Sequence, residues 1–391
     1  MKKLLSTLCL LSGLLGGSAG AQPMPQPPEI AARSYLLLDL TSNQQLAVKE
    51  ADAPVPPASL TKLMTAYLVF DALRLGKLEL TQTLPVSERA QRQPGSRMFL
   101  AAGMKVPVED LLKGLLVQSG NDAAITLAEG AAGSEERFVQ LMNEQAQALG
   151  MKATHFVNPT GLTQPGHLST GRDLAILATR LLRDFPDYAY FHAIRKYRYE
   201  GTPPANDSNR NLLLFRDPSV DGLKTGHTEE AGYCMIATAQ REFPNLGPDG
   251  AAGPRRLLAV VLGTDGESAR ATETQKLLNW GYTAFEAVKL FDANQAVLAP
   301  KVWKGTSVHA RLGRPQPVVV TVPAGSVSQL RTEVARPEPL VAPLAKGQVV
   351  GTLKIYLGEH SLSNIPLKAL ESVDEAGLMG QAWDAFRLWI Q

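Results

Sequence analysis

The sequence is poor in residue types that would commit it to a disulfide scaffold or a metal site. It contains two cysteines, Cys9 and Cys234. Because Cys9 lies in an N-terminal segment that we expect to be removed, no disulfide can form within the mature chain. Cys234 lies in the apolar alternation from Tyr233 to Ala237, which indicates a buried structural thiol. The six histidines show no H-E-x-x-H or paired Cys/His spacing, so we predict neither a metal nor another cofactor.

An excess of charge of one sign is also missing. Of the 39 basic residues, Lys2 and Lys3 belong to the N-terminal segment, which leaves 39−2=37 basic against 37 acidic residues. A neutral chain without a basic stripe gives no electrostatic reason to expect nucleic-acid binding.

The apolar run from Leu4 to Leu15 is too short to span a membrane, which takes about 20 residues. It follows two lysines and precedes small residues that end in Ala19-Gly20-Ala21. This order is typical of a secretory signal peptide over residues 1–21, with the mature chain beginning at Gln22. Because Cys9 lies inside the run and not at its end, we expect no lipid attachment there. The protein is predicted to be exported.

The remaining pattern predicts two domains and a terminal helix. Helices are predicted over residues 60–75, 108–129, 134–148, 170–182 and 272–288, and the first is apolar on nearly all sides. Strands are predicted over 34–40, 233–239 and 256–261, the last two as antiparallel neighbours joined by a long Gly- and Pro-rich loop, 243–254. Short alternating strands follow at 302–312, 318–322 and 349–357. We therefore predict an α/β (α+β) domain over 22–288, an all-β domain over 289–372 and a helix over 373–391.

The first predicted helix opens with a serine and a lysine on one face. Residues 56–62 read PPASLTK, and the prolines favour a helix start near Ser59. Ser59 and Lys62, three residues apart, lie on the same helix face. A serine hydroxyl needs an adjacent base to become a nucleophile, and a lysine can act as one when burial or a second cation lowers its pKa. Alone, the pair is more typical of a capping serine with a solvated lysine than of a catalytic site.

Two further motifs favour the catalytic interpretation. Ser119-Gly120-Asn121 follows a predicted helical run, where a loop can present polar groups beside a site. Lys224-Thr225-Gly226 opens the strand-rich part, and Gly226 would let substrate backbone approach a strand closely. Three such motifs in this order, 119−59=60 and 224−119=105 residues apart, are improbable as coincidence.

The set resembles the low-molecular-weight penicillin-binding proteins, and among them the serine-type D-alanyl-D-alanine carboxypeptidases. The resemblance extends over most of the mature chain. It includes the segments PASLTK at 57–62, QSGNDA at 118–123, THF at 154–156, DGLKTGHT at 221–228 and LLNWGY at 277–282. It implies a penicillin-binding/serine β-lactamase-like catalytic domain, peptidoglycan stem peptides as substrate and covalent inhibition by β-lactams.

The resemblance also implies the role of each residue in the reaction. Ser59 is expected to be the acylated nucleophile and Lys62 the base that takes its proton. Ser119 would relay a proton to the leaving amine. Lys224 would supply the positive charge that helps to keep Lys62 neutral.

A second group is expected to hold the substrate. Asn121 would bind the substrate amide, and Thr225 would contact the terminal carboxylate with Arg256 as its partner. The backbone N–H groups of Ser59 and His227 would form the oxyanion hole. The loop over residues 243–254 is longer and richer in Gly and Pro than is usual in the family, and it lies near the strand that carries Arg256.

Two other functions remain open from the sequence. A serine β-lactamase shares the acylation residues, but such enzymes usually carry S-D-N, and the stretch 156–162 offers no E-x-x-N pattern. A non-catalytic peptidoglycan-binding protein with the same fold would be expected to have lost one of the three motifs, and none is lost.

The C-terminal segment predicts an amphipathic helix that lies on a membrane. From Asp374 to Gln391, helical spacing gathers one apolar face: Leu378, Met379, Ala382, Trp383, Ala385, Phe386, Trp389 and Ile390. Two tryptophans at a chain end suit a lipid interface, although a helix that packs on its own protein remains possible. One arginine against three acidic residues gives −2, so apolar burial should dominate over attraction to anionic lipid. We expect peripheral attachment to the outer face of the cytoplasmic membrane, on the periplasmic side.

Overall fold

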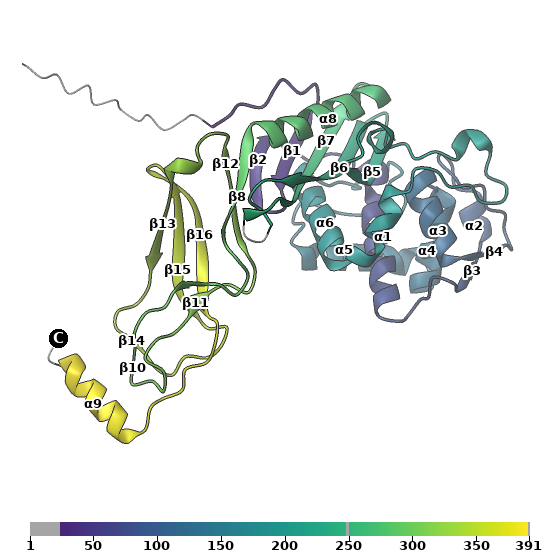
Figure 1. The fold of residues 1–391 in the computed structure, drawn as a ribbon. Helices are drawn as coiled ribbons and strands as arrows, with labels where there is room; N and C mark the ends of the chain where they lie inside the picture. Colours follow the sequence, from purple (N-terminus) through teal and green to yellow (C-terminus); the bar gives the residue numbers. More distant parts are fainter. Residues whose placement is uncertain (1–23, 248–249, 390–391) are drawn as a thin grey trace, which may run out of the picture.

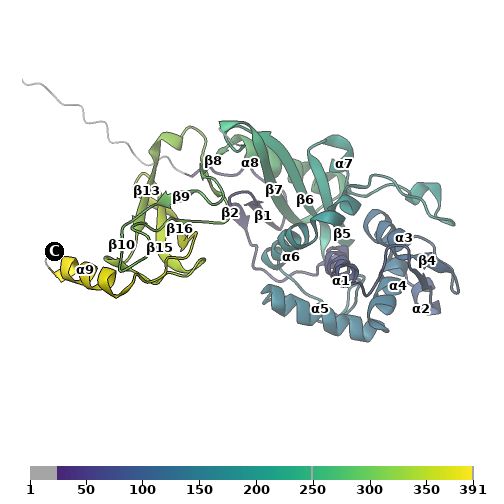
Figure 2. The same cartoon turned by 60° about the horizontal axis from the view of Figure 1, so that its bottom comes forward.

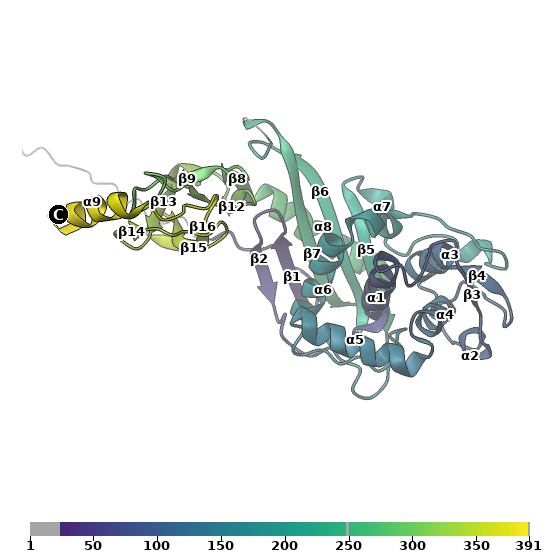
Figure 3. The ribbon, with the colours of Figure 1, turned by 90° about the horizontal axis from the view of Figure 1, so that it is seen from below.

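The computed structural model describes residues 24–247 and 250–389. The predicted signal peptide lies outside the described residues. Two domains and a terminal helix follow one another along the chain, and Figure 3 shows them in a row.

The first domain is built on a five-stranded antiparallel sheet. In spatial order its strands are β2 (Gln44–Lys49), β1 (Ser34–Asp39), β7 (Gly253–Thr264), β6 (Gly232–Phe243) and β5 (Val220–Thr228). The predicted pairing of β6 with β7 is confirmed, with Ala237 opposite Ala259. Both strands run further than predicted, so the loop between them is shorter than residues 243–254. Gly253 and Pro254 are the first residues of β7, a strand position that tolerates both residue types.

Helices cover both faces of this sheet (Figure 1). The helix α8 (Glu267–Thr283) lies on one face, and α1 (Lys62–Arg74) and α6 (Gly171–Asp184) lie on the other. The prediction of a helix to residue 288 was wrong at its end. Phe285 and Ala287 alternate buried with half-buried neighbours in strand β8 (Phe285–Phe291). The predicted domain boundary after residue 288 therefore lies inside a strand.

The helix α1 is at the centre of the helical region, surrounded by α4, α5 and α6 (Figure 2). Its apolar composition on all sides is explained by burial, since Leu63, Met64 and Phe70 are all inaccessible to solvent. The other elements of this region are β3 (Thr83–Pro85), α2 (Glu88–Gln91), β4 (Lys105–Pro107), α3 (Val108–Lys113), α4 (Asn121–Ala132), α5 (Glu135–Leu149) and α7 (Leu213–Arg216). Short 3-10 turns are η1 (Ala58–Thr61), η3 (Pro186–Ala193) and η4 (Pro204–Asn206).

The predicted helix 108–129 is interrupted in the middle. α3 continues into one turn of π-helix, η2 (Gly114–Gln118), and the chain then leaves helical geometry at Ser119 and Gly120 before α4 begins. The periodicity of apolar residues continues across the break, which is why the sequence predicted a single helix.

The second domain is all-β, as predicted. One sheet has the order β13 (Leu330–Ala335), β15 (Val349–Leu357), β16 (His360–Ala369), β11 (Leu312–Gly313) and β9 (Ala296–Leu298). Two pairs complete it: β12 (Val318–Pro323) with β8, and β10 (Val302–Trp303) with β14 (Leu340–Val341). The 3-10 turn η6 (Val327–Gln329) precedes β13. The strand predicted over 302–312 is thus two short strands separated by a loop.

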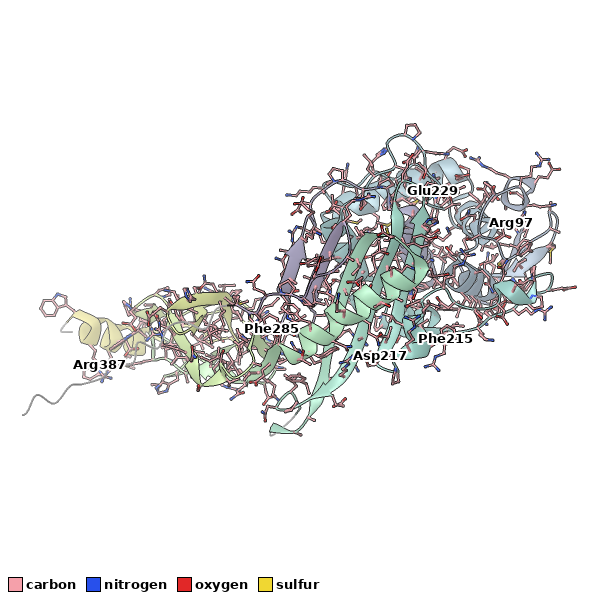
Figure 4. All side chains as sticks on the ribbon, turned by 90° about the horizontal axis from the view of Figure 1, so that it is seen from above. Arg97, Phe215, Asp217, Glu229, Phe285 and Arg387 are labelled. Carbon is pink, nitrogen blue, oxygen red and sulfur yellow. The ribbon has the colours of Figure 1, made fainter. Side chains whose placement is uncertain are left out.

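A buried ion pair anchors the junction between the domains. Arg255 Nε donates to Asp39 Oδ2 at 2.8 Å, and both side chains are fully buried. Thr321, on β12 of the second domain, donates its hydroxyl to the same carboxylate oxygen at 2.8 Å. Figure 4 shows Phe285 at this junction, and its carbonyl accepts from Arg255 Nη1.

The terminal helix α9 (Leu378–Trp389) begins later than predicted. Four of its apolar side chains are exposed: Leu378 (88%), Met379 (90%), Trp383 (61%) and Trp389 (82%). A hydrogen bond from the Lys304 backbone N–H to Asp384 Oδ2 at 2.7 Å joins the helix to the β-domain. Within the described parts of the chain, no helix is both long and apolar enough to cross a membrane.

Candidate active site

Ser59 lies in the 3-10 turn η1, directly before α1, as the prolines predicted. The turn is held from both sides. On one side Gly226 of β5 approaches so closely that an added Cβ would lie 3.2 Å from the Ser59 nitrogen. On the other side Gly161 leaves even less room, because a Cβ there would lie 1.8 Å from the Ala58 carbonyl oxygen. The lack of a side chain at Gly226 therefore lets the turn that carries Ser59 pack closely against β5. The sequence analysis had assigned this close approach to the substrate backbone.

Lys62 is fully buried with its amine beside the nucleophile. Its Nζ donates to Ser59 Oγ at 3.1 Å, to Asn121 Oδ1 at 2.7 Å and to the Thr160 carbonyl at 2.5 Å. Burial lowers the pKa of Lys62 to about 7, with a smaller contribution from the positive charge of Arg210. A substantial fraction of this amine is thus neutral near pH 7 and able to accept a proton from Ser59.

The loop that supplies the Thr160 carbonyl was not recognised from the sequence. Asn158 organises it, because its Oδ1 accepts from the backbone N–H groups of Thr160 and Gly161 at 3.1 and 2.7 Å. Gly161 adopts a φ of +82°, which suits glycine. The signal that could have revealed this loop is the N-P-T-G sequence at 158–161, which is typical of a turn.

Ser119 is positioned by the interruption of the helix between η2 and α4. Its φ of +61° is left-handed, which is uncommon for a residue other than glycine. Its Oγ is buried and has no hydrogen-bond partner among the described residues, although it lines the cleft with Ser59. A buried hydroxyl without a partner is free to bond a bound molecule.

Asn121 is the first residue of α4, and both polar atoms of its side-chain amide form hydrogen bonds within the protein. Besides accepting from Lys62, it donates from Nδ2 to the Pro94 carbonyl at 2.6 Å. Asn121 therefore orients Lys62, and its predicted contact with the substrate amide stays a prediction.

Lys224 is also buried, at the start of the close approach between β5 and η1. Its Nζ donates to the Thr225 carbonyl at 2.9 Å. Burial lowers its pKa well below the usual lysine value, and the charges of Lys62, Arg210 and Arg270 lower it further. The charge of Lys62 thus acts on the pKa of Lys224, and Arg210 is the cation that lowers the pKa of both amines.

The cleft has a volume of about 380 Å³, and its described charged residues are both arginines that the sequence analysis missed, Arg210 and Arg270. Thr225 and His227 lie in the same lining. Arg270 is buried at the start of α8, where its Nη1 donates to the Gly226 carbonyl at 3.4 Å. Its Nε is buried without a partner in the described structure. Arg270 Nη2 also forms an ion pair with Glu267 at 2.7 Å. Because Glu267 does not line the cleft, the charged groups in the described lining are the two guanidinium groups, which favours an anionic ligand.

The prediction that Arg256 binds the terminal carboxylate is contradicted. Arg256 pairs with Gln240 near the far end of β6, whereas Thr225 lies opposite Met235. Its guanidinium forms an ion pair with Asp221 at 2.8 Å, and Arg256 does not line the cleft. The error arose because the extended β6–β7 hairpin shifts Arg256 away from the site, while Arg270 arrives from the following helix.

His227 is exposed, and its ring stacks on Tyr233 with the centroids 3.9 Å apart. The His227 ring therefore packs against Tyr233 at the side of the cleft. The assignment of the backbone N–H groups of Ser59 and His227 to the oxyanion hole stays a prediction. No cluster of three metal-ligating side chains occurs within the described residues. Cys234 is buried and unpaired, as predicted.

Comparison with known proteins identifies the family. Residues 21–264 match the model of the Peptidase S11 family, described as D-alanyl-D-alanine carboxypeptidase, and residues 285–375 match the C-terminal domain of penicillin-binding protein 5. The chain is 38% identical to the D-alanyl-D-alanine carboxypeptidase DacC of Escherichia coli, over 96% of this chain and 95% of the relative.

Solved structures agree with this comparison. Penicillin-binding protein 5 of Haemophilus influenzae superposes with a TM-score of 0.82 at 34% identity, over 90% of this chain and all of the other. Penicillin-binding protein D2 of Listeria monocytogenes, solved in an ampicillin-bound form, matches 66% of this chain and all of the other with a TM-score of 0.55 at 31% identity. The fold, the cleft and these relatives together place the chain in the Peptidase S11 family of serine D-alanyl-D-alanine carboxypeptidases.

Proposed function

We propose that this chain removes the terminal D-alanine of peptidoglycan stem peptides through an acyl-enzyme on Ser59. The observation that carries the proposal is the buried Lys62 amine, 3.1 Å from Ser59 Oγ, with a pKa of about 7. A neutral amine at this distance is the adjacent base that a serine nucleophile requires.

In the first step the neutral Nζ of Lys62 takes the proton of Ser59 as Oγ attacks the carbonyl carbon of the penultimate D-alanine. The backbone N–H groups of Ser59 and His227 would stabilise the resulting oxyanion. Ser119, whose Oγ has no partner among the described residues, passes a proton to the amine of the terminal D-alanine. The C–N bond breaks, D-alanine leaves, and water later hydrolyses the ester on Ser59.

The terminal carboxylate of the substrate fits the cationic end of the cleft. Thr225 lies there beside Arg270 and Arg210. The unpartnered Nε of Arg270 supports a charge-assisted hydrogen bond to a carboxylate oxygen. We assign the role that the sequence analysis gave to Arg256 to these two arginines.

Hydrolysis of a penicilloyl ester should be slow. A class A serine β-lactamase uses a glutamate to activate water for deacylation, and the described residues that line the cleft include no Asp or Glu. This composition favours a peptidase with a long-lived penicillin adduct over a β-lactamase.

A fluorescent penicillin together with a soluble pentapeptide tests the proposal. One stable adduct per chain on the peptide that contains Ser59, release of D-alanine, and loss of both in Ser59→Ala are expected. Rapid clearance of the label would instead indicate a β-lactamase, and absence of both label and turnover would indicate a non-catalytic binder.

We further propose that the mature protein is exported and attached by α9 to the periplasmic face of the cytoplasmic membrane. The exposed Leu378, Met379, Trp383 and Trp389 support this proposal, because solvent exposure of four large apolar side chains on one short helix is costly. Truncation before residue 374 should yield a soluble, active enzyme. Detergent should release the full-length protein from membranes, whereas release by high salt alone would contradict the attachment.

A further inference from the structure

A groove with a volume of about 1390 Å³ lies between the two domains, separate from the catalytic cleft. On the side of the first domain its walls are the turn between β1 and β2 (residues 40–45) and the end of α6. On the side of the β-domain they are residues 314–320, which lead into β12, and residues 362–366 of β16. No step of the proposed reaction uses this groove.

The charged residues that line the groove are all arginines: Arg183, Arg256 and Arg314. The charge of Arg256 is neutralised by an ion pair with Asp221 at 2.8 Å. Among the described residues, the single ion-pair partner of Arg183 is Asp184 at 3.5 Å, and that carboxylate also pairs with Arg180 at 2.7 Å. The guanidinium of Arg314 has no ion pair or hydrogen bond within the described residues. The lining thus carries net positive charge without a carboxylate of its own, which favours an anionic ligand.

The uncharged lining suits a ligand with hydroxyl and amide groups. The groove contains side-chain amides and hydroxyls from both domains, among them Asn43, Gln45, Gln316, Ser363 and Asn364. Amides and hydroxyls donate and accept hydrogen bonds at once, as recognition of sugars and peptides requires.

Two strand edges without a neighbour face this space. Within the described strands, β12 pairs only with β8, and the outer edge of β16 pairs with β11 only at Lys368 and Ala369. Residues 318–320 and 362–366 therefore have backbone groups that no strand partner takes up. At Thr321 the edge is closed by Gln44, whose side-chain amide exchanges two hydrogen bonds with the Thr321 backbone at 2.9 and 2.6 Å. An extended peptide can bond to such an edge as a further strand.

We infer that this groove is a second binding site for the substrate polymer, one that holds an anionic, extended stem peptide of a peptidoglycan strand while the cleft processes another. The inference rests on the proposed carboxypeptidase function. Stem peptides carry carboxylates that match the arginines, backbone amides that match the open edges, and attached sugars that match the amide and hydroxyl lining.

The spacing of the sheet shows which substrates can use both sites. The groove adjoins β1 and β2 at one edge of the sheet, and the cleft adjoins β5 at the other edge. Four strand spacings separate β2 from β5, which is about 19 Å at 4.8 Å each. Arg256 lines the groove from β7, two strands from β5, but it pairs with Gln240 at the level of Val220. From Val220 to Gly226, which lies beside Ser59, β5 runs six residues, or about 20 Å at 3.4 Å each. An extended pentapeptide reaches at most about 18 Å. A single stem peptide bound in the cleft therefore cannot reach the groove, whereas a polymer can occupy both.

The test separates the groove from the cleft by blocking the cleft. Full-length mature protein in detergent is acylated with penicillin on Ser59 and sedimented with isolated peptidoglycan. The variant Arg183→Glu/Arg314→Glu is compared with Arg137→Glu/Arg331→Glu, which makes the same charge change at two half-exposed arginines outside the groove. The amount of penicillin label confirms that each variant is folded.

Acylated wild type and the control should sediment with peptidoglycan, and the groove variant should bind at least about 10-fold more weakly, which corresponds to 1.4 kcal/mol. The groove variant should also release D-alanine several-fold more slowly from peptidoglycan but at the unchanged rate from soluble pentapeptide. Equal binding of both variants, equal loss in both, or no sedimentation of acylated wild type would each overturn the inference. Absence of pentapeptide turnover by wild type would instead refute the carboxypeptidase function.

Discussion

At the scale of single residues, the environment of Lys62 determines whether the cleft can act at neutral pH. Burial removes water from the amine and lowers its pKa to about 7, while three hydrogen bonds keep it oriented toward Ser59. Because Thr160 offers only a carbonyl and Asn121 its Oδ1, the amine donates to both and can turn a lone pair to Ser59 only when neutral.

The first prediction concerns the pH dependence of acylation. The amine is protonated below its pKa and cannot accept a proton, so the rate of penicillin acylation should rise with pH around pH 7 and level off above it. Lys62→Arg should be nearly inactive at every pH, because a guanidinium stays protonated. Stopped-flow acylation from pH 5 to 10 measures this, and a flat profile would exclude Lys62 as the base.

Two charges near Lys62 should move this profile in opposite directions. The carboxylate of Asp122 raises the pKa of Lys62 and the guanidinium of Arg210 lowers it. Asp122→Asn should therefore shift the acylation profile to lower pH, and Arg210→Gln should shift it to higher pH. Shifts of the same sign in both variants would show that the electrostatic assignment is wrong. Asp122→Asn should also destabilise the fold by about 2 kcal/mol, because its carboxylate accepts from the backbone N–H groups of residues 98–100.

At the scale of elements, the site depends on short irregular segments packed against regular ones. η1 is held between β5 and the loop over residues 158–161, and glycines at both contacts allow the close approach. The regular elements provide the frame, but the loops set the distance between Ser59 and Lys62.

The third prediction compares two glycines of similar backbone conformation. Gly161 and Gly166 have φ values of +82° and +81°, but a Cβ on Gly166 would have only the His155 ring within reach, at 3.9 Å. Gly166→Ala should cost only the left-handed backbone penalty, about 1 kcal/mol. Gly161→Ala must displace the Ala58 carbonyl as well, and should slow acylation by more than 10-fold. Urea denaturation and penicillin labelling distinguish the two, and equal labelling rates would contradict the steric argument.

The sequence predicted the catalytic motifs well because each is contiguous in the chain. Ser59 and Lys62 follow from helical spacing, and the antiparallel pairing of β6 with β7 follows from alternation. The polar motif at Ser119 predicted a loop, but the helix prediction over residues 108–129 ran across it, since a π-turn leaves the apolar periodicity intact. Arg210 and Arg270 were missed because a loop and a helix bring them to the cleft across long stretches of sequence. Arg256 was misassigned because a position along a strand cannot be read without the register.

At the scale of the whole molecule, the second domain is attached at the edge of the sheet opposite the cleft. The ion pair of Asp39 with Arg255 is shielded from water, and Thr321 completes it from the β-domain. Among the described residues, Asp39, Arg255 and Thr321 form no hydrogen bond or ion pair with Ser59 or Lys62, so docking of the domains and catalysis should be separable.

The fourth prediction tests this separation. Thr321→Val removes the hydroxyl that bonds both Asp39 and Ser42, and should lower the free energy of unfolding by about 1–3 kcal/mol. The rate of penicillin acylation should stay unchanged. Thr332→Val, at an exposed position of β13, serves as the control and should alter neither quantity. A slower acylation in Thr321→Val would mean that the junction and the cleft are coupled.

The left-handed conformation of Ser119 affects the stability of the protein as well as its chemistry. Ala58, Phe99 and Ser119 all adopt positive φ around the cleft, at a typical cost of 1 to 2 kcal/mol each. Glycine at position 119 would relieve that cost and remove the hydroxyl in the same step. Under the proposed mechanism, Ser119→Gly would therefore give a more stable protein that lacks the proton relay. Stability and turnover thus make opposite demands on position 119.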